Sequence, residues 1–217
     1  RLKNRIVLSP MCQYKAVDGH VQDWHFAHHA RFALGGLGLS FVEATGVTRD
    51  GRITHGCTGI WDDSHIQGLK KIVHTYKSQN VAVGIQIGHA GRRASNTRPW
   101  DGAQPIPADG IEGPWKSVGP SAIAEQDGHP DPRSMTHQDI LDVVDAFSSA
   151  TKRALDAGFD TVEIHGAHGY LIHSFFSPIS NLRTDQYGGS LRQRMTFPLM
   201  IADAVRQIWP DDLPVFY

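Results

Sequence analysis

Cysteine is scarce in this sequence, with only Cys12 and Cys57 among 217 residues. Two thiols this far apart make neither a disulfide framework nor a common zinc-ligand spacing, so we expect a reducing, cytoplasmic setting. No apolar run approaches the roughly 20 residues of a membrane-spanning helix, and no signal peptide is visible, so we expect no membrane partner. The formal net charge of −1 lacks the positive excess that nucleic acids attract, so we expect no nucleic-acid partner either.

The sequence also lacks a G-x-G-x-x-G turn after its first apolar run, which argues against a dinucleotide-binding Rossmann unit. It has instead a regular alternation of short apolar runs with amphipathic segments. This pattern predicts strands over residues 5–11, 39–47, 81–88, 160–165 and 213–217, and helices over 24–36, 63–79, 136–158 and 190–209. Strands that are apolar on both faces are typical of a parallel sheet covered by helices, in either a (β/α)8 barrel or an open doubly wound sheet.

Several segment ends are marked by particular residues. Thr136 and Asp139 resemble a capping box, and Gly158 is a helix stop. In the last helix, Pro198 predicts a kink or a delayed start. The irregular residues 89–135 predict a lid or a binding loop, because long loops without regular structure are usually functional in compact domains.

Polar side chains gather at the carboxyl end of each expected strand. They are Cys12 and Tyr14 after the first strand, Glu43 at the second, Gln86, His89 and Arg92 at the third, and His165, His168 and Tyr170 at the fourth. A TIM barrel builds its active face in this way, from the carboxyl ends of its strands. We therefore predict a single α/β domain over residues 1–217 with the TIM (β/α)8 barrel fold. Because a full barrel takes about 250 residues, we expect it to be truncated after about five strands.

The segment "HGAH", residues 165–168, carries the sharpest chemical signal. Imidazole is a common metal ligand, so His165 and His168 with Glu163 predict the metal site of a barrel hydrolase in one interpretation. The other interpretation uses both imidazoles as donors to one anionic oxygen, with Tyr170 as a nearby proton donor. His173 needs no functional role in either. The residues alone leave both interpretations open.

Two further positions have competing interpretations. Gln86 would either satisfy backbone groups or bind a planar heterocycle through one donor and one acceptor. Cys12, in the segment "SPMCQY", would be either a buried structural cysteine or a polarizable neighbour of a flat cofactor. For Arg92 and Arg93 we expect mainly a surface or loop-anchoring position.

Four segments resemble the Old Yellow Enzyme family of flavin-dependent ene-reductases. They are "RIVLSPMCQY", "VEATGVTRDGRIT", "GIQIGHAGRRAS" and "AGFDTVEIHGAHGYLIHSFFSPISNLRTDQYGGSLRQR". The motifs "SPMCQY", "RPWDG" and "GPSAIA" are most similar to those of the thermophilic-like subgroup that includes xenobiotic reductase. The resemblance implies a TIM barrel with FMN lying across its mouth. It also implies that NADPH or NADH reduces the flavin, which then passes a hydride to the β-carbon of an alkene conjugated to a carbonyl or nitro group.

The same resemblance implies roles for individual residues. The flavin contacts it implies are Ser9, Pro10, Met11 and Cys12, together with Ala44 and Gln86. His165 and His168 would bind the activating oxygen of the substrate, and Tyr170 would donate a proton to the α-carbon. Tyr14 would be a further substrate contact. Cys12 would also contact the substrate and adjust the redox potential of the flavin, so it joins the two histidines and Tyr170 in the catalytic set.

The family also implies features that would follow Tyr217, namely an arginine contact to the flavin, strands six to eight and a phosphate site. We therefore expect residues 1–217 alone to be neither stably folded nor active. The resemblance implies small enone and nitro substrates, and a parent protein that is a homodimer or homotetramer. The alternatives are the metal-dependent hydrolase described above and a non-catalytic flavin-binding fragment.

Overall fold

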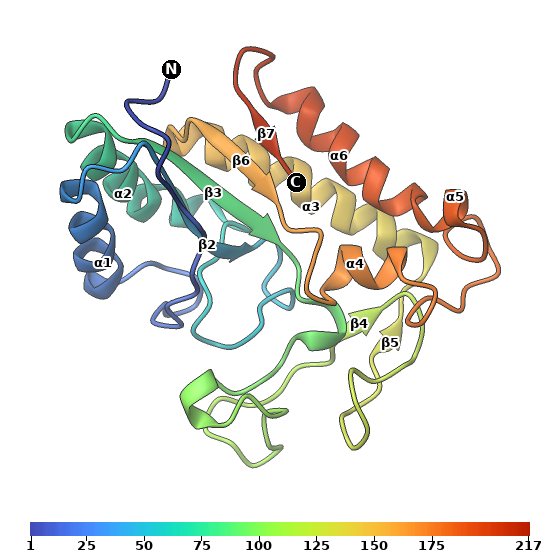
Figure 1. The fold of residues 1–217 in the computed structure, drawn as a ribbon. Coiled ribbons are helices and arrows are strands. Elements are labelled where there is room, and N and C mark those ends of the chain that lie inside the picture. Colours follow the sequence, from blue (N-terminus) through green and yellow to red (C-terminus); the bar gives the residue numbers. More distant parts are fainter.

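A five-stranded parallel sheet forms the centre of the protein, which the computed structural model describes over residues 1–217 (Figure 1). Its strands are β1 Val7–Leu8, β2 Leu39–Gly46, β3 Ala82–Gly88, β6 Thr161–Ile164 and β7 Val215–Phe216. They lie in the order β1-β2-β3-β6-β7, and every neighbouring pair is parallel. Strand order follows chain order without the reversal of a doubly wound sheet, so the predicted barrel topology is confirmed for these five strands.

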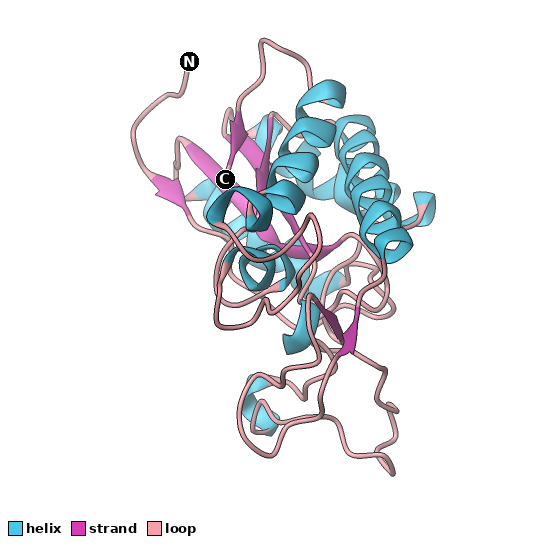
Figure 2. Cartoon of the chain, turned by 90° about the vertical axis from the view of Figure 1, so that its right-hand side faces the viewer, coloured by secondary structure: helices cyan, strands magenta, loops and turns pink.

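Four longer helices connect the strands and lie on one face of the sheet (Figures 1 and 2). They are α1 Asp23–Leu34, α2 Ile66–Ser78 with a preceding 3-10 turn η1 Asp63–His65, α3 His137–Ala157 and α6 Thr196–Ile208. Helix α1 packs against α2, α2 against α3, and α3 against α6, so the helices form a layer in the same order as the strands. None of the helices combines the length and the apolar composition that crossing a bilayer requires.

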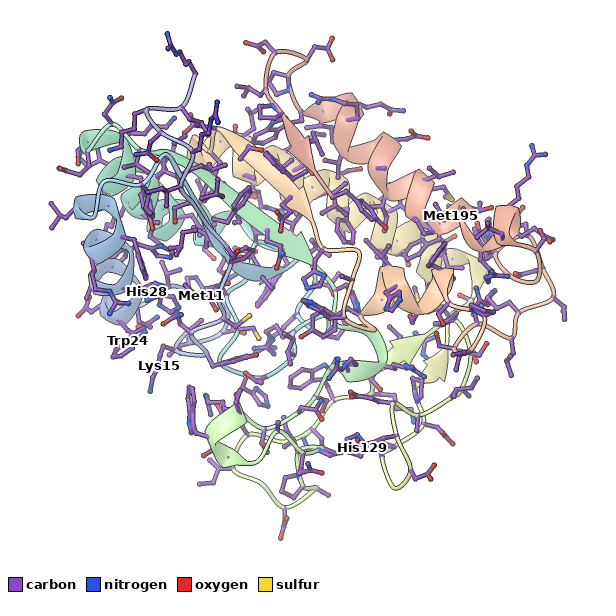
Figure 3. The ribbon with its side chains drawn as sticks, viewed as in Figure 1. Met11, Lys15, Trp24, His28, His129 and Met195 are labelled. Carbon is purple, nitrogen blue, oxygen red and sulfur yellow. The ribbon has the colours of Figure 1, made fainter.

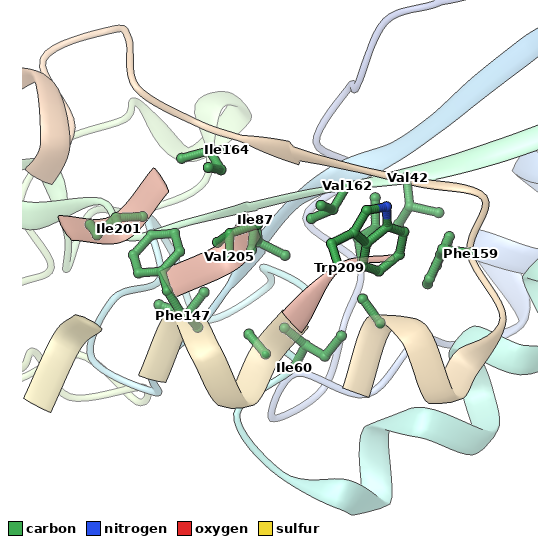
Figure 4. Packing of buried hydrophobic residues seen from close by; sticks show 14 of the residues in the cluster. Val42, Ile60, Ile87, Phe147, Phe159, Val162, Ile164, Ile201, Val205 and Trp209 are labelled. Carbon is green, nitrogen blue, oxygen red and sulfur yellow. The ribbon is translucent and has the colours of Figure 1, made fainter. Parts of the chain in front are cut away.

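The main core lies between the sheet and this helix layer (Figure 4). Val42, Ile87 and Val162 of the strands are fully buried in one cluster with Phe147 of α3 and Val205 of α6. Burial of such a side chain contributes about 1.5–3 kcal/mol. This packing fixes the strands in place, and with them the positions of the polar residues at the strand ends.

The predicted helix 136–158 is confirmed as α3, including both of its ends. Thr136 Oγ1 accepts the backbone N–H of Asp139 at 3.1 Å, and Asp139 Oδ2 accepts the backbone N–H of Thr136 at 2.7 Å. Gly158 follows the helix with a φ of 90°, a left-handed conformation that glycine adopts without strain. The capping box and the glycine stop therefore act as the sequence predicted.

The predicted helix 190–209 is divided into two helices. A short helix, α5 Leu191–Arg194, ends at Met195, and α6 then begins at Thr196. Pro198 stands in the first turn of α6, where its missing N–H has no helical partner to lose. The delayed start that Pro198 predicted is thus confirmed.

Two other predictions need correction. Only Val7 and Leu8 of the predicted strand 5–11 pair with β2, and Pro10, two residues further on, has no N–H to continue the ladder. The residues 89–135, expected to be an irregular loop, contain a small parallel sheet that the sequence did not predict. It pairs β4 Val118–Gly119 with β5 Arg133–Ser134, and the same region contains the 3-10 turns η2 Gly91–Arg93 and η3 Pro99–Asp101.

Candidate active site

The carboxyl ends of the strands lie at the same edge of the sheet because the strands are parallel. A cavity at this edge is lined by residues that follow three different strands, among them Ala44 of β2, His89 after β3, and His165 and Tyr170 after β6. Cys57, to which the sequence assigned no role, lines the same cavity from the loop after β2. Of the predicted site residues, the structure brings Ala44, His165 and Tyr170 together at this cavity.

A larger cavity opens at the amino ends of the strands, where Leu39, Ala82 and Thr161 line it. Its lining includes the exposed ion pair of Lys77 and Asp160 but no histidine, cysteine or tyrosine. TIM barrels place their reactive groups at the carboxyl ends of the strands. We therefore place the candidate active site at the carboxyl edge.

His165, His168 and Tyr170 form a cluster of three rings after β6. The ring centroids of His165 and His168 are 4.9 Å apart, those of His165 and Tyr170 are 4.8 Å apart, and those of His168 and Tyr170 are 6.2 Å apart. The chain turns sharply here because His168 and Gly169 have positive φ values of 58° and 73°. This turn brings Tyr170, the residue before α4 Leu171–Phe176, back towards His165.

His165 is buried and its hydrogen bonding identifies its tautomer. The side chain is 6% exposed, and its Nδ1 accepts the backbone N–H of Ala167 at 3.2 Å. In the neutral ring the proton therefore resides on Nε2, which is left to donate. Burial, and secondly the neighbouring His168, lower the pKa of His165 to about 4, so the ring is neutral at pH 7.

Tyr170 keeps its proton in the same cluster. Burial raises the pKa of its phenol well above the usual range, and the nearby Cys12 acts in the same direction. Arg93 opposes this shift, because its guanidinium carbon lies 5.6 Å from the centroid of the Tyr170 ring. Arg93 also donates to the carbonyl oxygen of His168 at 2.6 Å and pairs with Glu125 at 2.6 Å. Sequence analysis gave Arg93 a surface or loop-anchoring position, and the structure shows it anchoring the loop that carries His168.

The segment after β1 presents the remaining predicted contacts. Ser9 and Met11 are exposed, and Pro10, Cys12 and Tyr14 are half-buried. Burial raises the pKa of the Cys12 thiol far above its usual range, with smaller contributions from Cys57 and Glu43, so the sulfur is uncharged. Lys15 lies near Trp24 of α1 (Figure 3), with its ammonium 5.7 Å from the Trp24 ring centroid.

Gln86 and Glu163 are paired with each other across β3 and β6. The two residues are register partners, and Gln86 Nε2 donates to Glu163 Oε1 at 2.6 Å. One N–H of the Gln86 amide is thus used, which leaves its second N–H to donate and its carbonyl oxygen to accept a bond. The Glu163 carboxylate is held by its bond from Gln86. No group of three His, Cys, Asp or Glu side chains is arranged to hold a metal ion. The hydrolase interpretation with His165, His168 and Glu163 as ligands therefore has no support in the geometry.

Comparison with known proteins identifies the family to which the chain is similar. The family model described as the NADH:flavin oxidoreductase / NADH oxidase family matches residues 1–217. An NADPH dehydrogenase of Geobacillus thermodenitrificans is 46% identical over 217 residues, which are 99% of this chain and 58% of that protein. An NADPH dehydrogenase of Bacillus subtilis is 44% identical over 217 residues, which are 99% of this chain and 59% of that protein.

The fold is also that of solved structures in this group. Morphinone reductase superposes with a TM-score of 0.84 at 29% identity, covering 99% of this chain and 57% of that chain. The chain therefore spans somewhat more than half the length of the proteins it matches. Together with the motifs and the strand-end cluster, these matches show that the chain belongs to the NADH:flavin oxidoreductase / NADH oxidase family, the Old Yellow Enzyme group of TIM-barrel flavin oxidoreductases.

Proposed function

We propose that the protein is an FMN-dependent ene-reductase acting on small α,β-unsaturated carbonyl or nitro compounds, including foreign ones. FMN and a nicotinamide nucleotide are the cofactors of its family. When bound, FMN would supply hydride to the β-carbon of the alkene, after reduction by NADPH or NADH. The observation that carries the proposal is the cluster of His165, His168 and Tyr170 at the carboxyl edge of the sheet.

The two histidines would hold the oxygen of the substrate. Addition of hydride to the β-carbon places negative charge on that oxygen, and positioned N–H donors stabilise charge where it develops. His165 suits this role because it is neutral and its Nε2–H is not used inside the protein. His168 lies beside it with an exposed side chain, from which it can reach the same oxygen.

Tyr170 would donate the proton that completes the reaction at the α-carbon. A proton donor must remain protonated at the working pH, and the raised pKa of Tyr170 meets that condition. Its ring also stands beside His165, so one bound alkene could meet both side chains. Tyr14, near Cys12, would contact the substrate from the other side of the site.

The residues fit a flat flavin ring in their chemistry. Cys12 and Ala44 are small, uncharged and half-buried at the strand ends, as side chains beside a flat apolar ring would be. The free carbonyl oxygen of Gln86 offers an acceptor for an N–H at the edge of the ring. Ser9, Pro10 and Met11 would contribute backbone and side-chain contacts from the segment after β1. Assembly as a homodimer or homotetramer remains a prediction from the resemblance.

Stopped-flow oxidation of the reduced full-length enzyme by 2-cyclohexenone tests this proposal. Replacing His165 with Ala removes one oxyanion donor, so we expect the rate of flavin reoxidation to fall by about 10²–10³. Tyr170→Phe should slow the same step while the affinity for the enone is kept. Normal binding and turnover in His165→Ala would exclude the oxygen-binding role. A purified protein without a flavin absorbance band but with a stoichiometric metal would favour the hydrolase instead.

A further inference from the structure

The loop after β2 is joined to the long segment 89–135 by three of its backbone carbonyl oxygens. The donors and acceptors are Trp115 Nε1 to Asp50 at 2.7 Å, Ala90 N to Gly51 at 2.7 Å, and Asn96 N to Ile53 at 2.9 Å. Arg52, which lies between Gly51 and Ile53 in the chain, contacts the long segment through its side chain instead. The reaction proposed above uses none of these contacts.

Arg52 is a buried arginine that lies over two tryptophan rings. Its guanidinium carbon is 5.4 Å from the ring centroid of Trp61 and 5.1 Å from that of Trp115. The residue is 5% exposed, and its Nε donates to the carbonyl oxygen of Arg49 at 2.7 Å. The carboxylate of Asp18 is 3.9 Å from Nη1, too far for a hydrogen bond. Because a desolvated cation is attracted strongly to an aromatic face, the two indoles help to offset the cost of burying this charge.

The two tryptophans belong to different parts of the molecule. Trp61 packs directly on the backbone of Gly59, where a Cβ atom would clash with the indole. Trp115 belongs to the long segment, whose residues 106–116 form neither helix nor strand. Arg52 therefore joins a ring that is held by the scaffold to a ring that is carried by an irregular loop.

The long segment also contacts Tyr14, the predicted substrate contact after β1. Arg98 Nε donates to the carbonyl oxygen of Tyr14 at 3.3 Å, and the rings of Trp100 and Tyr14 meet edge to face with their centroids 6.1 Å apart. Tyr14 has a positive φ of 53°, a conformation that persists only when the surroundings support it. A Cβ atom at Gly56 would clash with the Tyr14 carbonyl oxygen, so a glycine is needed for this close approach.

Both contacts lie beside the candidate active site. Arg52 lines the same cavity at the carboxyl edge as His165 and Tyr170. We propose that residues 96–116 form a fixed wall of the substrate site, that Arg52 is the positioning residue that clamps this wall through Trp115, and that Trp100 limits the size of the alkene beside Tyr14. The size limit rests on the proposed function, whereas the clamp does not.

Limited proteolysis of the full-length enzyme by trypsin tests the clamp. Lys116 is exposed next to Trp115, and cleavage after it reports local opening of the wall. Arg52→Met keeps the length of the side chain but removes its charge. Loss of the cation–aromatic contact should raise the rate of cleavage after Lys116 by about fivefold to thirtyfold. Mass spectrometry identifies the cleaved bond.

Three comparisons separate the clamp from a general loss of stability. Cleavage after Lys152, which is exposed on α3, reports opening of the scaffold and should not change in Arg52→Met. Arg49→Met is the matched control, because the exposed Arg49 side chain pairs with Asp18 at 2.8 Å and should leave the wall as in wild type. Arg52→Lys keeps the charge and should recover part of the protection. An unchanged rate after Lys116 in Arg52→Met, or an equal rise after Lys152, would overturn the clamp.

Two variants of Trp115 serve if Arg52→Met does not fold, as judged by circular dichroism. Trp115→Phe and Trp115→Leu both lose the hydrogen bond to Asp50, but only phenylalanine keeps a ring for Arg52. Cleavage after Lys116 should therefore be at least about fivefold faster in Trp115→Leu than in Trp115→Phe. Equal rates in the two variants would contradict the cation–aromatic clamp.

Substrate size tests the wall in the full-length enzyme. The measured quantity is the ratio of kcat/KM for 2-cyclohexenone to that for the bulkier 4,4-dimethyl-2-cyclohexenone. Trp100→Ala should lower this ratio by about tenfold, and Arg52→Met should lower it in the same direction, while Arg49→Met should keep the wild-type ratio. An unchanged ratio in Trp100→Ala would overturn the size limit. A wild-type enzyme that reduces neither enone would overturn the proposed function and the size limit, but not the clamp measured by proteolysis.

Discussion

Lowering the pH from 7 to 5 should leave His165 mostly neutral, although an ordinary histidine takes up a proton over that range. The ring is 6% exposed, it accepts the N–H of Ala167 through Nδ1, and His168 stands beside it. These surroundings lower its pKa to about 4, with burial as the main cause. At pH 5 roughly one ring in ten would be protonated, against nearly all rings of an unperturbed histidine with a pKa of about 6.5.

The same shift couples the stability of the fold to pH. Between about pH 6.5 and pH 4 the unfolded chain binds a proton at His165 that the folded chain does not, so stability rises with pH across this window. The free energy of unfolding should fall by about 1.4 kcal/mol per pH unit below pH 6.5, and by about 3 kcal/mol in total at pH 4. Above pH 6.5 the group should contribute no pH dependence.

Nuclear magnetic resonance of the histidine ring protons measures this directly. The signal assigned through His165→Gln should stay at its neutral position down to about pH 5 in the folded protein. In the urea-unfolded chain it should titrate near the ordinary value. A folded-state midpoint near 6.5 would refute the reasoning, because it would show that burial and the neighbouring His168 do not lower the pKa of this ring.

Three further predictions follow from contacts outside this ring. Tyr76→Phe should cost about 1–3 kcal/mol of unfolding free energy in urea titration, because the Tyr76 hydroxyl joins His29 Nδ1 and Ser40 Oγ at 2.8 Å each in the core. Thr136→Ala should cost about 1 kcal/mol in the same assay through loss of the α3 cap, and Thr136→Ser should recover most of it. Arg93→Ala should slow flavin reoxidation by enone by up to about 10² through misplacement of the cluster, with an unchanged circular dichroism spectrum; an unaltered rate would show that the bracing contacts do not matter.

Much of the scaffold was predictable because its signals are local. The capping box at Thr136 and the stop at Gly158 set both ends of α3 within a few residues of sequence. The apolar runs of β2 and β3 likewise lie close to their predicted positions. The length of the two-residue strand β1 was overestimated, because an apolar pattern does not show which residues form hydrogen bonds with a neighbouring strand.

The parts that were missed depend on contacts between distant residues. Arg93 braces His168 across 75 positions in the chain, and Glu43 reaches Gln13 across 30. The extra residue in β2 is visible only through its register against β3. The pairing of Gln86 with Glu163 likewise required the alignment of two strands, so the sequence could not separate a metal ligand from an interior partner.

The most direct test of the account is an isotope-labelling experiment during reduction of an enone. With unlabelled NADPH in deuterated water, the saturated product should carry deuterium at the α-carbon, delivered by Tyr170, and hydrogen at the β-carbon, delivered through the flavin. Tyr170→Phe should slow the reduction and lower the stereochemical preference at the α-carbon. The β-carbon of its product should still carry hydrogen. Deuterium at the β-carbon, or a Tyr170→Phe variant with unchanged rate and stereochemistry, would contradict the proposed reaction.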